Sequence, residues 1–130
     1  MKKGFTLLEL IVVVIIIGIL AMIALPKFVR VAEKARSAEG RMLLAAIRSS
    51  QFRYYTEHDK WTSITSDLDM TYSLPTYFNT VNALNPANAT TGNIGTVTRT
   101  NSYMLNIDIN GGIACVNSGN SGYNCPDAGF

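Results

Sequence analysis

The pattern of apolar and polar residues begins with one long apolar segment near the N-terminus. From Phe5 to Leu25 there are twenty-one residues with a single charge, Glu9. At about 1.5 Å of rise per residue, this segment forms a helix as long as the ~30 Å hydrocarbon core of a bilayer. It therefore predicts a transmembrane helix. Lys2 and Lys3 precede it, and the bias of positive charge places the N-terminus on the cytoplasmic side.

A second helical pattern runs from Lys27 to about Glu57. Apolar and small residues recur there at spacings of three and four and form one stripe: Val31, Ala35, Ala38, Met42, Ala45, Ser49 and Phe52. Charged residues lie off this stripe, namely Arg30, Glu33, Lys34, Arg41 and Arg48. A stripe of this kind predicts the helix face that packs against a sheet or another helix.

Strand patterns are concentrated near the C-terminus. Ile94 to Thr98 and Ile113 to Val116 are short β-rich runs, and between them lies an alternating apolar series, Tyr103, Leu105, Ile107 and Ile109. Asn110-Gly111-Gly112 is typical of a hairpin turn. The apolar side of this hairpin predicts a sheet that lies across the C-terminal half of the long helix, which is an α+β fold.

The segments between helix and hairpin predict loops. Residues 59–72 are polar and rich in turn formers, and residues 74–89 hold Pro75 and Pro86 among Asn and Thr. We expect at most one helical turn in the second segment. Asn88-Ala89-Thr90 matches an N-glycosylation sequon.

Glu9 is the exceptional residue of the apolar segment. A carboxylate at the centre of a bilayer costs about 2.5 to 3.5 kcal/mol, and less near the edge. One explanation is that Glu9 reaches the headgroups or is protonated. The other is a cationic partner, and because no Lys or Arg occurs between Phe5 and Leu25, that partner must be a chain terminus or another subunit.

The residues around Glu9 carry a family resemblance. Gly4-Phe5-Thr6-Leu7-Leu8-Glu9 follows a short basic leader, Gly18 lies mid-helix and Pro26 lies at the helix exit. This pattern resembles the processing site of type IV prepilins. The resemblance implies that a prepilin peptidase cleaves between Gly4 and Phe5 and methylates the new amino group of Phe5. A secretory signal peptide would instead have a shorter apolar core, followed by a small-x-small cleavage site.

Cleavage at this position would leave an ammonium group on Phe5. If that ammonium meets Glu9 of a neighbouring copy, their attraction offsets the desolvation of both groups and sets an axial register. The resemblance also implies that the helix polymerises into a filament, and that the segment interrupted at Gly18 and Pro26 can stretch or melt there. The precursor is expected in the inner membrane, and the mature subunit in an extracellular pilus at the cell surface.

The expected organisation has four parts: a leader at 1–4, a transmembrane and assembly helix at 5–26, a stalk helix at 27–57 and a head at 58–130. Lys27 to Lys60 holds eight basic and four acidic residues, a net charge of +4, and Trp61 to Phe130 has a net charge of −3. A basic stalk suits lipid phosphates, extracellular DNA or acidic faces of neighbouring heads. A solvated face with no partner is the remaining explanation.

Cys115 and Cys125 are the only cysteines. On the outer side of the membrane they predict a disulfide that closes a loop of Asn, Ser and Gly, and two free thiols are the alternative. The loop also resembles the C-terminal disulfide region of type IVa pilins.

The sequence predicts no enzyme. It has no cluster of metal ligands and no phosphate-binding loop, and its one histidine, His58, lies in a charged turn. No catalytic residue and no cofactor are expected. Calcium binding at Asp67 and Asp69, or at Asp108 and Asp127, is a weak alternative because EF-hand spacing is absent.

The leading functional prediction is a structural subunit of a type IV pilus that supports adhesion, twitching motility or DNA uptake. Its expected partners are further copies of itself, a prepilin peptidase, the inner-membrane assembly machinery and, before assembly, the lipid bilayer. The alternatives are a pseudopilin of a type II secretion system, a minor tip pilin that binds DNA or a surface, and an anchored domain that never polymerises. The cysteine loop favours a pilus, because major pseudopilins usually use calcium there.

Overall fold

The computed structural model describes residues 4–73, 76–87, 92–100, 102–117 and 125. They form a helix α1 (Leu7–His58), a 3-10 turn η1 (Thr65–Asp67) and four strands, β1 (Phe78–Ala83), β2 (Asn93–Arg99), β3 (Tyr103–Asp108) and β4 (Ile113–Asn117). The chain divides into two compact units, Met1–Ala32 and Glu33–Phe130. The second unit therefore contains the C-terminal part of α1 together with the sheet.

The first unit contains the apolar part of α1. Its large apolar side chains from Phe5 to Leu25 are 47–81% exposed. By length and composition, the helix can cross a membrane. Helical conformation continues through Gly18 and Pro26, so neither residue ends the helix. A segment that stretches or melts in a filament stays a prediction.

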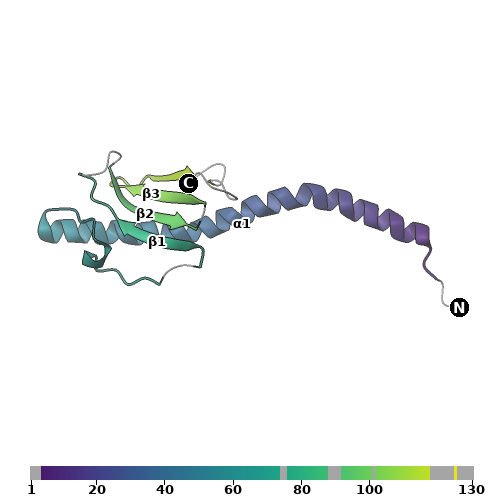
Figure 1. Cartoon of the computed structure of the whole chain (residues 1–130), viewed down its shortest axis with the longest axis horizontal. Helices are drawn as coiled ribbons and strands as arrows, with labels where there is room; N and C mark the ends of the chain where they lie inside the picture. Colours follow the sequence, from purple (N-terminus) through teal and green to yellow (C-terminus); the bar gives the residue numbers. More distant parts are fainter. Residues whose placement is uncertain (1–3, 74–75, 88–91, 101, 118–124, 126–130) are drawn as a thin grey trace. The chain divides into compact units, whose positions relative to one another are not determined.

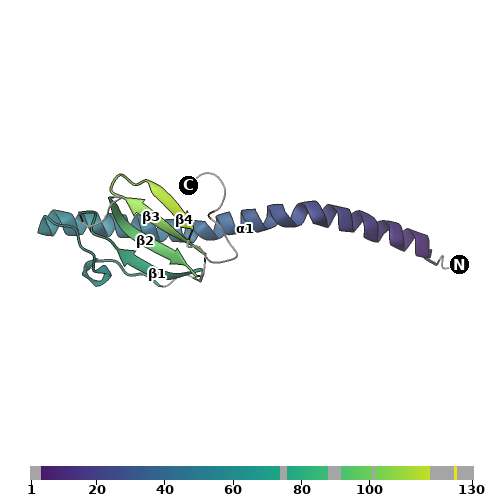
Figure 2. The same ribbon diagram turned by 45° about the horizontal axis from the view of Figure 1, so that its top comes forward.

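The sheet of the second unit is antiparallel, with the strand order β1-β2-β3-β4. Figures 1 and 2 show these strands over one face of the C-terminal part of α1. Val97 pairs with Val81 and Leu105, and Leu105 pairs with Cys115, so one row of side chains crosses all four strands. Val81, Val97 and Leu105 are buried against the helix. The predicted α+β architecture is confirmed.

The predicted C-terminal hairpin is confirmed as β3 and β4. The Gly111 amide donates to the Asp108 carbonyl at 3.1 Å and the Asp108 amide to the Gly112 carbonyl at 3.0 Å. Gly111 has a φ of 93°, a conformation that glycine adopts without strain. Ile109 was expected on the buried side but lies beyond the end of β3 and is 39% exposed.

Strand β1 corrects the prediction that residues 74–89 form a loop with at most one helical turn. Its buried residues Phe78, Val81 and Ala83 do not alternate regularly, because the register shifts between Phe78 and Thr80. Asn79, Thr80 and Asn82 fill the intervening positions, and the two asparagines mask the strand signal. Pairing with β2, a distant segment, decides the conformation here. Residues 74, 75, 88 and 89 lie outside the described residues.

The buried face of α1 is also not the one predicted. The buried residues of α1 are Glu33, Ser37, Gly40, Leu44, Ile47, Ser50 and Gln51. Met42, from the predicted stripe, is 75% exposed. It lies two residues from buried Gly40, which is roughly 200° around the helix. The prediction failed because polar residues on the buried face are satisfied by hydrogen bonds, which an apolar pattern does not reveal.

Two glycines let the sheet approach α1 closely. A Cβ atom added at Gly40 would lie 2.6 Å from the Phe78 ring, and one added at Gly95 would lie 2.6 Å from Ile47 Cγ2. These distances are shorter than any carbon contact tolerates. Leu44 and Ile47 are consequently fully buried between helix and sheet.

Candidate functional site

Thr6 and Glu9 form a reciprocal set of hydrogen bonds at the start of α1. The Thr6 amide and hydroxyl donate to Glu9 Oε2 at 2.9 and 2.8 Å, and the Glu9 amide donates to Thr6 Oγ1 at 3.3 Å. Thr6 precedes the first helical residue, Leu7. This arrangement is a capping box, in which both ends satisfy amides that the first helical turn leaves without a partner.

The capping box gives Glu9 polar contacts within its own chain. Headgroups, protonation and a cationic partner are the explanations predicted from the sequence, and Thr6 is not among them. The signal was present, since Thr-x-x-Glu before an apolar run is a helix-start pattern. The predicted pairing of Glu9 with the Phe5 ammonium of another copy stays a prediction, as do cleavage after Gly4 and methylation of Phe5.

Glu33 forms a buried polar cluster with residues of the sheet. It pairs with Arg99 of β2, whose Nη2 donates to Glu33 Oε2 at 3.1 Å, and the Tyr103 hydroxyl of β3 donates to Oε1 at 3.2 Å. Arg36, which also lies in α1, donates from Nη1 to Glu33 Oε2 at 3.2 Å. The side chains of Glu33 and Arg99 are 5% and 9% exposed. A buried carboxylate with several donors of this kind fixes how the elements pack.

The cluster changes the ionisation of Tyr103. Burial, and secondly the negative charge of Glu33, raise the pKa of its phenol. The hydroxyl therefore stays protonated and donates to Glu33. The prediction that Glu33 lies off the packing face is wrong, because no signal in the sequence identifies the distant residues that pair with it.

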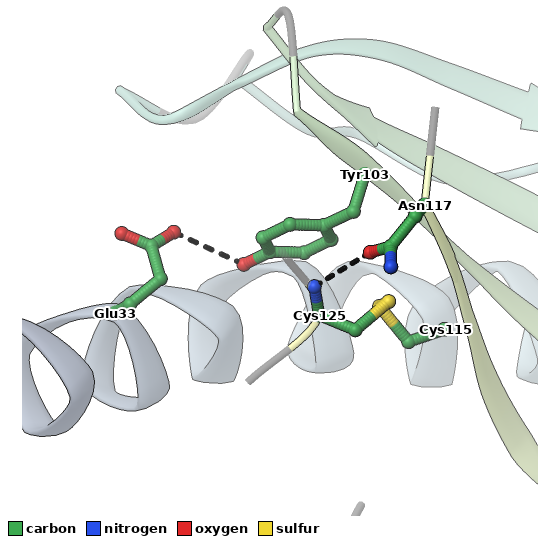
Figure 3. Close-up of a disulfide and its surroundings, with 5 residues drawn as sticks. All are labelled: Glu33, Tyr103, Cys115, Asn117 and Cys125. Carbon is green, nitrogen blue, oxygen red and sulfur yellow. Dashed lines mark hydrogen bonds between the residues drawn. A yellow bond between two sulfur atoms is a disulfide. The ribbon is translucent and has the colours of Figure 1, made fainter. Parts of the chain in front are cut away.

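Cys115 and Cys125 form the predicted disulfide, with their Cα atoms 5.8 Å apart. The Cys125 amide donates to Asn117 Oδ1 at 2.7 Å, so Cys125 is bound to β4 twice (Figure 3). Both cysteines pack against the hydrophobic core. Figure 3 also shows the Tyr103 hydroxyl directed toward Glu33. The disulfide thus holds a residue near the C-terminus against the edge of the sheet.

The aspartates named for calcium have other partners. Arg53 donates to both carboxylate oxygens of Asp69 at 2.6 and 2.7 Å, and this bond lowers the pKa of Asp69. Asp108 accepts from the Gly112 amide at 2.8 Å. Across the part of the chain that the structure describes, no three side chains of His, Cys, Asp or Glu converge on a metal site. Asp127 and the sequon at 88–90 lie outside it.

The N-terminal segment matches a known family. Residues 1–25 match the family described as "Prokaryotic N-terminal methylation motif". This is the class of N-terminus that the prepilin resemblance predicted.

Relatives over a longer stretch are type IV pilins. The chain is 36% identical over 67 residues to the type IV major pilin protein PilA of Myxococcus xanthus, covering 52% of this chain and 30% of that protein. It is 41% identical over 61 residues to PilE1 of Neisseria gonorrhoeae, covering 47% and 37%. It is 50% identical over 48 residues to the narrow pilus major component PilA5 of Thermus thermophilus, covering 37% and 41%.

These matches confirm the resemblance: over about half of its length the chain is similar to type IV pilins. It aligns with about a third of the length of the first two relatives, 30% and 37%. No solved structure matched the chain.

Proposed function

We propose that this chain is a structural subunit of a type IV pilus filament. One combination supports the proposal: an exposed apolar helix, preceded by a methylation motif and followed by a folded sheet. Apolar surface of this extent needs lipid or protein around it. Lipid would cover it in the membrane-anchored precursor, and helices of other copies would cover it in the filament.

Processing is the first step of the proposal. A prepilin peptidase cleaves the Gly4–Phe5 bond and methylates the new Phe5 amine. Gly4, Phe5 and Thr6 precede the helix, so this bond is outside the hydrogen-bonded helical turns. The precursor has its N-terminus inside the cell, and the sheet unit is exported.

Assembly follows from the charge that cleavage creates. The Phe5 ammonium of one copy binds the Glu9 carboxylate of another in the apolar bundle, where attraction between charges is strong. A carboxylate has about four acceptor positions, so the two Thr6 donors on Oε2 leave capacity for the ammonium. The pairing sets the axial register, which is the best-supported use of a buried ion pair.

The filament leaves the inner membrane through the pilus assembly machinery and reaches the cell surface. There it supports adhesion, twitching motility or DNA uptake, with no catalytic residue and no cofactor. The related proteins named as major pilins favour this function over a secretion pseudopilin.

Expression in a pilus-forming bacterium that lacks its own major pilin tests the proposal. We expect filaments labelled along their whole length by antibody to this chain in electron micrographs. Label at the tips alone would indicate a minor pilin. Restored protein secretion without surface filaments would indicate a pseudopilin. A membrane pool with neither result would leave an anchored domain that does not polymerise.

A further inference from the structure

The face of the sheet that turns away from α1 carries mostly uncharged polar side chains. Val81, Val97 and Leu105 are buried against the helix, so their neighbours along each strand point to the opposite face. Figure 2 shows α1 passing along the other side of the sheet. Residues paired directly across strands share a face. The outward face therefore has two rows: Thr80, Thr98, Met104 and Val116, and Asn82, Thr96, Asn106 and Ala114.

The two sides of this outward face differ in chemistry. Strands β1 and β2 contribute hydroxyl and amide groups to it, and β4 contributes the apolar side chains of Ala114 and Val116. All the residues of both rows are half-buried or exposed, and Val116 is 43% exposed. A polar area and an apolar area thus lie side by side on one accessible surface.

The outward face has almost no charge. Among the described residues of the four strands, charged side chains occur only at Arg99 and Asp108. Arg99 is buried and pairs with Glu33 of α1. Asp108 lies at the end of the outward face, next to the hairpin turn, and its Oδ1 accepts from the Gly112 amide at 2.8 Å. A charged ligand would therefore find no opposite charge across the middle of this face.

The polar groups of the face have hydrogen-bonding capacity left. Asn82, Thr98 and Asn106 have no side-chain hydrogen-bond partner among the residues that the structure describes. Thr80 donates to Asn79 Oδ1 at 3.4 Å and keeps its acceptor positions. The Thr96 hydroxyl oxygen is buried, so it is not part of the accessible surface. The accessible groups include both donors and acceptors, which suits a ligand rich in hydroxyl or amide groups.

We propose that the outward face of the sheet binds a neutral polysaccharide with extended chains. The proposal rests on the proposed pilus function, because it names the kind of surface to which the filament would adhere. A sugar ring has CH groups on its faces and hydroxyls around its edge, so it matches apolar side chains on β4 beside hydroxyls and amides on β1 and β2. Side chains on paired strands are about 5 Å apart, so several of them contact one polysaccharide chain. Each contact is weak in water, and many copies along one filament multiply the affinity.

Vesicles of zwitterionic lipid that carry the full-length chain test this binding without requiring filaments. The readout is cosedimentation with two insoluble neutral polysaccharides, cellulose and chitin. We expect at least one of them to retain these vesicles at least about tenfold better than vesicles without protein, because many copies bind at once. Retention should change less than about twofold between about 0.1 and about 1 M salt, over which the Debye length falls from roughly 10 to roughly 3 Å.

Thr80→Val combined with Thr98→Val removes two hydroxyls from one directly paired position of the face. Valine keeps the branched shape and the strand preference of threonine. We expect at least about fivefold lower retention, because two hydrogen bonds to the polysaccharide are lost. Thr71→Val combined with Thr76→Val is the matched control, since it removes two hydroxyls at exposed positions outside the strands. It should bind as the wild type does, and each variant should carry the intact disulfide.

Absence of retention on both polysaccharides would overturn the proposal. Wild-type retention by the Thr80 and Thr98 double variant would overturn it as well. Retention that disappears at high salt would indicate an ionic ligand such as DNA, which also contradicts a neutral one. None of these results concerns filament formation. A wild-type chain that binds polysaccharide but forms no filaments would instead contradict the proposed function.

Discussion

At the scale of single residues, the carboxylate of Glu9 is the group on which the proposed assembly depends. Its bonds to Thr6 explain how a charged group is tolerated at the start of an apolar helix before assembly. They also hold the carboxylate toward the N-terminal end of α1, where cleavage would place the Phe5 ammonium. Thr6 thus caps the helix and also positions Glu9 for the proposed contact between copies.

The substitution Glu9→Gln removes the negative charge of residue 9 but keeps a hydrogen-bond acceptor for Thr6 in the helix cap. Glutamine can still accept a hydrogen bond from Thr6, but it cannot form an ion pair with an ammonium. We expect a processed subunit in the membrane and at least about tenfold fewer filaments, measured by immunoblot of sheared surface material. Asp59→Asn is the control, because it also removes one charge and Asn tolerates the positive φ of 53° found there. Equal filament yields from Glu9→Gln and the wild type would contradict the ionic pairing.

Tyr103 predicts how the second unit responds to alkaline pH. Because its pKa is raised in the folded state above the ordinary value of about 10, folding favours the protonated phenol. This contribution to stability is complete below about pH 10 and is lost as the pH rises toward the folded pKa. We expect the free energy of unfolding of detergent-solubilised protein to fall more steeply above that pH in the wild type than in Tyr103→Phe.

At neutral pH, Tyr103→Phe should lower the free energy of unfolding by about 1 to 3 kcal/mol, because Glu33 loses a buried donor. Tyr72→Phe, at a tyrosine that is 37% exposed, should leave the stability at neutral pH unchanged. Identical pH profiles for wild type and Tyr103→Phe would show that the phenol is not tied to folding.

At the scale of elements, the closest contact between α1 and the sheet is made at Gly40. Alanine there would favour the helix by about 1 kcal/mol, but its methyl group would lie 2.6 Å from the Phe78 ring. We expect Gly40→Ala to destabilise the second unit by about 1 to 3 kcal/mol in chemical denaturation. Ser49→Ala removes only a solvent-exposed hydrogen bond from Arg53 and should have little effect.

A second substitution shows whether the ring causes this loss. Phe78→Leu removes the atoms that meet the new methyl group, so it should cost less in the Gly40→Ala background than in the wild type. Additive costs of the two substitutions would mean that helix and sheet do not meet as the structure places them.

The disulfide ties Cys125 to β4, the edge strand of the sheet. Cys115→Ser combined with Cys125→Ser should lower the free energy of unfolding by about 2 to 4 kcal/mol. Reduction of the wild-type protein should give a similar decrease, which serves as the control. An unchanged denaturation midpoint in both cases would show that Cys125 adds nothing to the core.

The elements that the sequence predicted are those with local signals. The apolar run from Phe5 to Leu25 and the alternation from Tyr103 to Ile107 need no distant partner to be recognised. Strand β1 and the buried face of α1 were missed for the opposite reason. Val81 lies in a strand because it pairs with Val97 in the sheet. Glu33 is buried because it forms an ion pair with Arg99. Those contacts join residues far apart in sequence.

The candidate site shows the same division. Cys115 and Cys125 were paired correctly because the chain offers no other cysteine. Thr6 could have been found from its spacing to Glu9.

At the scale of the whole molecule, the two units have different surroundings. The first exposes apolar side chains that need lipid or other helices, and the second has its own core, a buried ion cluster and a disulfide. The central claim is that cleavage before Phe5 turns a membrane anchor into an assembly element. The most direct test is mass spectrometry of the N-terminal peptide of subunits taken from sheared filaments. The account predicts a peptide that begins with N-methylated Phe5, and filaments whose subunits still begin at Met1 would contradict it.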